Sequence, residues 1–167
     1  MDTKKLRQKI LDLAIRGKLV PQDPNDEPAS VLLERIKAEK ERLIKEGKIK
    51  RSKKTTKTSD TPHYENVPFE IPENWVWTDI ENICSKIGSG STPRGSNYSS
   101  KGIPFFRSQN IYNNGLVYED IKFISEDIHQ TMIGTEVLPN DLLLNITGGS
   151  LGRCAIVPAN FQRGNVS

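Results

Sequence analysis

The first part of the chain carries apolar side chains at helical spacing. In residues 3–16 one stripe, at positions i, i+4, i+7 and i+8, consists of Leu6, Ile10, Leu13 and Ala14. In residues 29–47 a second stripe consists of Leu32, Ile36 and Leu43. Prolines in the connection between them forbid a continuous helix. The pattern predicts a helical hairpin over residues 1–47, in which Gly17 and Gly47 end the helices by taking the left-handed C′ position.

After residue 61 the helical spacing gives way to short apolar runs bounded by Gly, Pro, Asn and Asp. These runs predict strands at residues 75–77, 102–111, 116–125, 142–146 and 154–157, the fourth of them buried. A short helix is expected after residue 78, and another, capped by Ser125, over residues 126–134. The fold class is therefore α+β (mixed α/β), with a helical arm followed by a small mixed-sheet domain. We expect Trp75 and Trp77 to lie in a core.

Charge and composition divide the chain further. Residues 1–60 hold 17 Lys/Arg against 10 Asp/Glu, whereas residues 61–167 hold 7 against 11. We predict a helical arm over residues 1–47, a basic linker over 48–62 and the mixed-sheet domain over 63–167. A basic arm suggests a polyanionic partner, but a solvated helical surface explains the same charges equally well.

The two helices carry more apolar surface than they can bury against each other. A partner surface, or the rest of a longer bundle, is therefore implied. The residues expected at that partner interface are Leu6, Ile10, Leu13, Leu32, Ile36 and Leu43.

Several function classes find no support in the sequence. No apolar run approaches the roughly 18 residues of a membrane span, and no secretory signal opens the chain, so a cytoplasmic location without membrane contact is expected. Cys84 and Cys154 have no metal-site spacing, and His63 and His129 stand alone. The glycines at 148–152 do not match the dinucleotide-binding fingerprint, and GSGSTPRGS lacks the G-K-[ST] ending of a phosphate loop. These observations favour a non-catalytic binding protein without cofactor or metal.

A series of short motifs carries a family resemblance. In order they are PENWVWTDIENI, SGSTP, GIPFFRSQNI, LPNDLLLNITGGSLGR and GNVS. Together they resemble the target-recognition domain of the DNA-specificity (S) subunit of type I restriction-modification enzymes. The preceding segment, LRQKILDLAIRGKLVPQDPNDEPASVLLERIKAEKERL, resembles the helical spacer of those subunits. Asn140 replaces a glycine that is common in the family, and we expect the turn to persist because Asn tolerates the left-handed conformation.

The resemblance implies a partner set and a role. Such a subunit is non-catalytic, reads one half of a bipartite target in double-stranded DNA, and docks the methyltransferase (M) subunit, which methylates adenine with S-adenosylmethionine. In the full complex a restriction/motor (R) subunit uses ATP. Family domains continue past GNVS, so the recognition domain is expected to be partial, incomplete at its C-terminus. The alternative is a truncated protein-interaction module that binds the M subunit or, by self-association, another copy of itself without reading DNA.

The residues expected to contact DNA are polar or cationic and lie in loop-like segments. We predict a DNA-binding set that comprises Arg94, Ser96, Asn97, Tyr98, Lys101, Arg107, Gln109, Ser150 and Arg153. Arg and Gln offer the forks that guanine and adenine accept in the major groove. For each segment a structural role stays open: a solvated loop at 94–101, a turn at 107–110, and a tight strand connection at 147–153. For Asn110 we favour the structural role.

Overall fold

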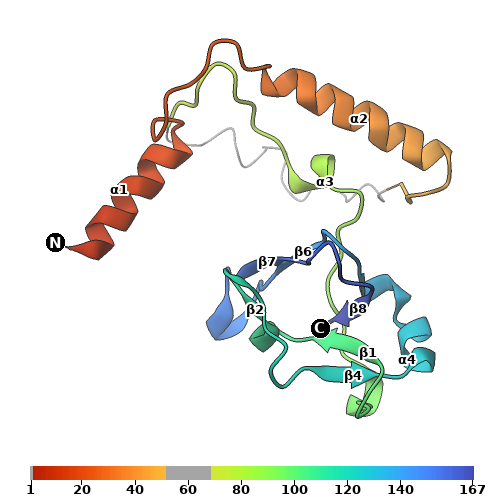
Figure 1. Cartoon of the computed structure of the whole chain (residues 1–167). Coiled ribbons are helices and arrows are strands. Elements are labelled where there is room, and N and C mark those ends of the chain that lie inside the picture. Colours follow the sequence, from red (N-terminus) through yellow and green to blue (C-terminus); the bar gives the residue numbers. More distant parts are fainter. Residues whose placement is uncertain (1, 52–68) are drawn as a thin grey trace. The chain divides into compact units, whose positions relative to one another are not determined.

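The computed structural model describes residues 2–51 and 69–167 (Figure 1). It contains two compact units, residues 1–87 (the N-terminal unit) and 88–167 (the C-terminal unit). The α+β class predicted from the sequence is confirmed. The domain ranges predicted from composition stay a prediction. Most of the predicted basic linker, and His63, lie outside the described residues.

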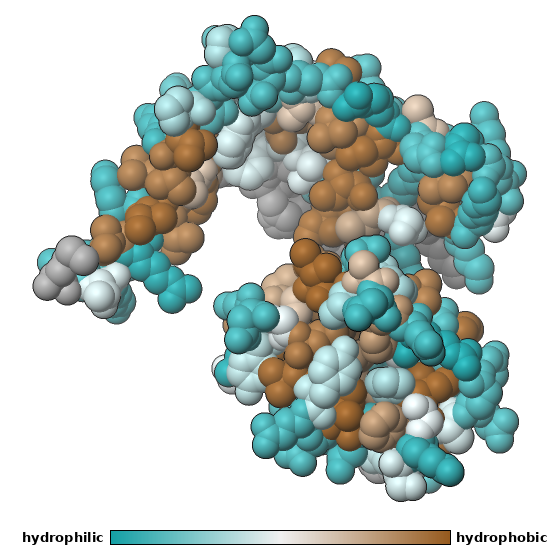
Figure 2. Space-filling view, viewed as in Figure 1, coloured by the Kyte–Doolittle hydropathy of each residue, from teal (hydrophilic) through white to brown (hydrophobic). Residues whose placement is uncertain are grey.

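The N-terminal unit contains the two predicted helices and a short third one. They are α1 (Thr3–Ile15), α2 (Ala29–Lys45) and α3 (Ile80–Ile83). Asp2 caps α1 by accepting hydrogen bonds from the backbone N–H groups of Lys4 and Lys5, at 3.1 and 3.2 Å. Gly17 and Gly47 follow the C-caps with φ of 66° and 70°, which confirms their predicted role. No residue of α1 or α2 is buried, and Figure 2 shows apolar side chains gathered along α1.

The segment after residue 69 packs against the end of α1. The indole Nε1 of Trp75 donates to Oε1 of Gln22 at 3.0 Å, and the Gln22 side-chain amide donates to the carbonyl of Gly17 at 2.9 Å. The Arg16 guanidinium lies 5.3 Å from the centroid of the Phe69 ring. This small cluster fixes the chain where it leaves the first helix.

The predicted strand at 75–77 is wrong, and so is the core position of its tryptophans. The backbone N–H of Trp75 donates to the carbonyl of Pro72 at 3.0 Å, which makes a turn instead of a strand. Trp75 and Trp77 are 40% and 41% exposed. Trp77 packs on Phe69 with ring centroids 5.9 Å apart. The turn leaves these residues without a neighbouring strand, so Trp77 packs on Phe69 and Trp75 lies beside Gly17, just after α1, at the surface.

Gly17 gives a testable contrast with Gly47. A Cβ on Gly17 would lie 2.4 Å from Cγ of Pro72, whereas a Cβ on Gly47 would meet nothing within 4 Å. Both glycines have similar positive φ, so alanine at either position carries the same backbone penalty of about 1–2 kcal/mol. We expect Gly17→Ala to increase amide hydrogen exchange across residues 16–22 and 69–75, and the matched control Gly47→Ala to leave those segments unchanged. Equal effects of the two substitutions there would contradict the packing described.

The C-terminal unit is built on a mixed four-stranded sheet with strand order β4-β1-β8-β5. Its strands are β1 (Ile103–Phe106), β4 (Lys122–Ile124), β5 (Glu136–Val137) and β8 (Gly164–Val166). β1 is antiparallel to β4 and parallel to β8, and β5 is antiparallel to β8. Two ribbons accompany the sheet: β2 (Ile111–Tyr112) with β3 (Gly115–Leu116), and β6 (Leu142–Leu144) with β7 (Cys154–Ile156). The helix α4 (Glu126–Thr131) begins at the predicted cap, Ser125.

Two predicted strands are interrupted, each for a local reason. The prediction at 102–111 becomes β1, a 3-10 turn η3 (Ser108–Asn110) and β2, because the Asn110 side chain accepts from the backbone N–H of Arg107 and closes the turn. The prediction at 116–125 becomes the end of β3 and then β4, separated by Asp120 with φ of 52°. Asn140 has φ of 68°, as expected for a residue that replaces glycine.

The core of the C-terminal unit lies on both sides of β1. Phe106 is fully buried, with its ring 5.6 Å from Phe161 and 5.8 Å from Tyr118, centroid to centroid. On the other side Phe105 packs with Ile103 and Ile124. The segment 142–146, predicted as a buried strand, is buried on one face only: Leu143 is buried, whereas Leu142 is 62% exposed. β6 belongs to a two-stranded ribbon, so its second face has no covering layer in this unit.

None of the helices within residues 2–51 and 69–167 is long and apolar enough to cross a membrane.

Candidate functional site

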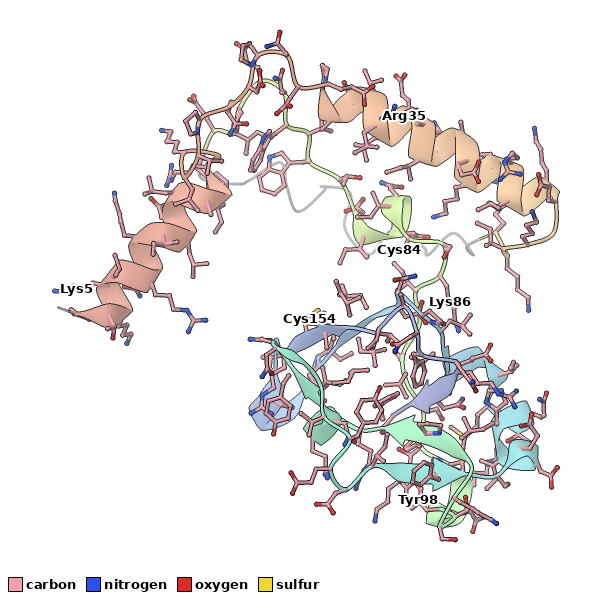
Figure 3. The ribbon with its side chains drawn as sticks, viewed as in Figure 1. Lys5, Arg35, Cys84, Lys86, Tyr98 and Cys154 are labelled. Carbon is pink, nitrogen blue, oxygen red and sulfur yellow. The ribbon has the colours of Figure 1, made fainter. Side chains whose placement is uncertain are left out.

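The loop that leads into β1 is tied down at its C-terminal end. It contains a short 3-10 turn, η2 (Arg94–Ser96), in which Gly95 has φ of 67°. Ser99 bridges to β4 through its backbone N–H, which donates to the carbonyl of Phe123 at 2.9 Å. The ring of Tyr98, labelled in Figure 3, packs on Phe105 with centroids 5.7 Å apart. These contacts hold the loop against the sheet while its polar tip stays outside.

The predicted DNA-contacting residues of this loop divide by exposure. Arg94, Asn97 and Lys101 are exposed, whereas Tyr98 is half-buried and anchors the loop. The side chain of Ser96 lies outside the described part of the chain. An anchored loop with an exposed cationic tip can present its side chains at fixed positions, which is what recognition of another surface requires.

The segment after β1 is held by its own side chains. The Arg107 guanidinium donates through Nη2 to the carbonyl of Asp120 at 2.9 Å. Asn110 is fully buried, and its Nδ2 donates to the carbonyls of Val117 and Glu119 at 3.0 and 3.2 Å. The structural role favoured for Asn110 is therefore confirmed. Gln109, between them in sequence, is exposed.

The glycine-rich turn between β6 and β7 is fastened to the segment after β1. Asn145 is buried, and its Nδ2 donates to the carbonyl of Ser108 at 2.9 Å and to Oγ of Ser150 at 3.0 Å. Gly148 and Gly152, with φ of 72° and 83°, let the chain reverse around this amide. Ser150 is thereby turned toward Asn145, so its hydroxyl already has a partner.

Arg153 closes the same turn and reaches β2. Its guanidinium carbon lies 4.3 Å from the centroid of the Tyr112 ring. The next residue, Cys154 (labelled in Figure 3), donates its backbone N–H to Oδ1 of Asn113 at 3.0 Å. The turn is therefore joined to η3 by hydrogen bonds and to β2 by the contact of Arg153 with Tyr112. These segments form one patch at the C-terminal end of β1, whereas the 94–101 loop precedes its N-terminal end.

Sequence comparison finds curated proteins to which this chain is similar. Over 141 residues, 84% of the chain, it is 40% identical to the type I restriction enzyme EcoAI specificity subunit from Escherichia coli. The chain is a homologue of type I restriction enzyme specificity subunits. It is also 56% identical over 82 residues, 49% of the chain, to the EcoEI specificity subunit of the same species. The chain spans 23% and 13% of the lengths of these two relatives. No protein-family model matches it.

In the structure of this chain, the nine predicted contact residues do not form one cluster. Arg94 to Lys101 precede β1, whereas the remaining predicted residues follow its end: Arg107, Gln109, Ser150 and Arg153. The strand between them has four residues, each advancing about 3.3 Å. The prediction therefore describes two candidate surfaces at opposite ends of one strand.

Only some of the cationic side chains in the C-terminal unit of this chain have an ionic or hydrogen-bonding partner among the described residues. In residues 88–167, Arg163 pairs with Glu126 at 2.7 Å, and Arg107 is bound to a carbonyl. The pKa of the Glu126 carboxyl is lowered, first by a hydrogen bond from Gln130 and then by the charge of Arg163. Apart from Arg107, the cations of this unit that make no ion pair with another described residue are Arg94, Lys101, Lys122 and Arg153.

Sequence reasoning missed three residues of these surfaces. Lys122 lies on β4, the strand to which the 94–101 loop is bridged, and only the strand pairing brings it there. Asn145 and Tyr112 come together with the glycine-rich turn across β6, β7 and β2. For Asn145 a signal existed, since a polar residue that ends an apolar strand before a glycine-rich turn is a natural hydrogen-bonding centre.

The described residues also bear on metal chemistry. Residues 2–51 and 69–167 contain no group of three or more His, Cys, Asp or Glu side chains arranged to hold a metal ion.

Proposed function

We propose that this chain is part of the DNA-specificity subunit of a type I restriction-modification system and contributes sequence recognition, not catalysis. The observation that carries the proposal is the 40% identity to a specificity subunit over 84% of the chain. One recognition domain of this kind would read one half of a bipartite site in double-stranded DNA.

The C-terminal unit supports this proposal through its unpaired cations. Arg94 and Lys101 flank an anchored loop and have no ion pair with another described residue, and Lys122 lies on the strand to which the loop is bridged. Phosphate contacts by such side chains provide affinity, and polar side chains of the same loop, such as Asn97, provide base contacts. Arg107 is a weaker candidate, because its guanidinium already binds the Asp120 carbonyl.

The N-terminal unit supports the docking of a protein partner, which we propose to be the methyltransferase subunit. Of the predicted interface, Leu6, Ile10 and Leu32 are exposed, between 42% and 46%. Leu13, Ile36 and Leu43 are half-buried, and α3 packs against α2 and covers part of its stripe. Exposed apolar stripes on both long helices are costly in water and favour burial against another surface. In the complete enzyme that subunit would in turn bind the restriction subunit.

We expect the DNA-binding constant to fall steeply with salt concentration, and we expect Arg94 and Lys101 to contribute to that dependence. A plot of the logarithm of the binding constant against the logarithm of the salt concentration has a negative slope. We expect the Arg94→Ala/Lys101→Ala double variant to make that slope less steep by about two, because each phosphate contact contributes about one. Binding to a duplex DNA pool is measured by fluorescence anisotropy over a salt series, with the chain alone and with the methyltransferase subunit of the same system.

Arg163→Ala is the matched control, because Arg163 is exposed but already paired with Glu126. It should leave the slope unchanged. A wild-type binding constant that does not vary with salt would contradict DNA recognition. Co-elution with the methyltransferase subunit, or self-association on a sizing column, with no DNA binding under any condition would favour the interaction module instead.

A further inference from the structure

Arg153 and Tyr112 form a stacked pair at the surface of the C-terminal unit. Tyr112 is the last residue of β2 and Arg153 immediately precedes β7, and these two strands are neighbours (Figure 1). The guanidinium carbon lies 4.3 Å from the ring centroid. Tyr112 is 36% exposed and Arg153 is half-buried, so part of the pair is accessible to a ligand.

The backbone that carries Arg153 is fixed on both sides. The N–H of Arg153 donates to the carbonyl of Ser150 at 3.1 Å, and its carbonyl accepts from the N–H of Asn145 at 2.9 Å. Cys154, the next residue, is bound to the side chain of Asn113. A long side chain on a fixed backbone and against a flat ring has lost most of its rotamer freedom before it meets a ligand.

The guanidinium of Arg153 still has charge and hydrogen-bond donors available for a ligand. Arg153 makes no ion pair with any carboxylate of the described residues, unlike Arg163. This guanidinium donates no hydrogen bond to another described residue, so a guanidinium placed over the ring keeps N–H donors for a ligand. That fork matches a pair of acceptors at fixed spacing, such as two phosphate oxygens or the O6 and N7 atoms of guanine.

We propose that Tyr112 is a positioning residue that holds Arg153 as a bidentate donor to an acceptor pair on duplex DNA. This inference rests on the proposed function, and it adds a residue that the sequence did not single out. Arg153 touches the DNA, whereas Tyr112 acts through the stack. The phenol hydroxyl has no part in this role, so a phenylalanine at 112 preserves it.

The test is a double-mutant cycle in DNA affinity at one salt concentration, on a randomised duplex pool, with the bound fraction sequenced. We expect Arg153→Ala to weaken binding about tenfold, as for one lost bidentate contact. Tyr112→Ala should weaken it by a similar factor, and Tyr112→Ala/Arg153→Ala by no more than Arg153→Ala alone. Tyr112→Phe should bind like the wild type. Thermal unfolding of each variant shows whether the fold is retained.

The outcomes separate this inference from the proposed function. If the wild type binds DNA and Arg153→Ala binds equally well, the inference is overturned and the proposed function stands. Additive losses from the two alanine variants would also overturn it, because Tyr112 would then act independently of Arg153. A loss uniform across sequences assigns the acceptors to phosphate, and a loss of preference at one guanine assigns them to a base edge; both support the positioning role. A wild type that binds no DNA overturns both.

Discussion

Phe106→Ala is expected to unfold the C-terminal unit in a large fraction of molecules. Phe106 is fully buried on β1 and packs on Tyr118, from the connection between β3 and β4, and on Phe161, from the connection between β7 and β8. Removing a buried Phe ring costs about 3–5 kcal/mol, from lost transfer free energy and the cavity left behind. A domain's whole free energy of unfolding is about 5–15 kcal/mol, so a small unit retains little. Guanidinium unfolding followed by circular dichroism measures the loss.

Tyr118→Ala is the matched control for that experiment. Tyr118 contacts the same ring edge-on but is half exposed, so its substitution removes one side of the contact without opening the core. We expect a loss of about 1 kcal/mol, in the range of a single aromatic pair. If both substitutions cost the same, Phe106 does not hold the core together as the packing indicates.

The sequence predicted those features of the fold that depend on neighbouring residues. The two long helices follow from apolar spacing alone, and their ends follow from Gly17 and Gly47, which take the positive φ that other residues resist. Asn140 likewise took the left-handed conformation that its type tolerates. Each of these predictions needs only local information, since the helix period and the C′ position are properties of a few consecutive residues.

Features that depend on tertiary pairing were out of reach. Trp75 and Trp77 look like core residues by composition, but a turn at Pro72 leaves them at the surface. The run 142–146 is apolar throughout, and only the strand order shows that one face of β6 is uncovered. An apolar run reports that a segment can be buried, whereas the topology decides which of its faces is.

The candidate site was predictable by residue type but not by grouping. Composition marked the 94–101 loop and Arg153 as cationic or polar segments. The sequence did not show that Arg107 donates a hydrogen bond to the Asp120 carbonyl, that Tyr98 anchors its loop, or that the Arg153 guanidinium lies over the Tyr112 ring. These distinctions rest on side-chain contacts that only the packing of the folded chain creates, such as that between β2 and the start of β7.

Asn165→Ala is expected to be the most disruptive polar substitution in the C-terminal unit. Asn165 is fully buried on β8. Its Oδ1 lies 2.6 Å from Nδ1 of the equally buried His129, and its Nδ2 donates to the Met132 carbonyl and Thr135 Oγ1 at 3.0 and 3.1 Å. Because Nδ2 has two acceptors, Oδ1 faces the ring and accepts a hydrogen bond from Nδ1 of His129.

Alanine at 165 would leave several buried polar groups without partners, at about 1–3 kcal/mol each, so we expect a loss of about 2–4 kcal/mol in the free energy of unfolding. Asn160→Ala, the same change at an exposed turn position, should stay within about 0.5 kcal/mol of the wild type. Nuclear magnetic resonance of the His129 ring gives a second reading: loss of its Nδ1 hydrogen bond should speed exchange of that proton. An unfolding midpoint of Asn165→Ala equal to that of Asn160→Ala would mean that this buried pair does not join α4 to the sheet.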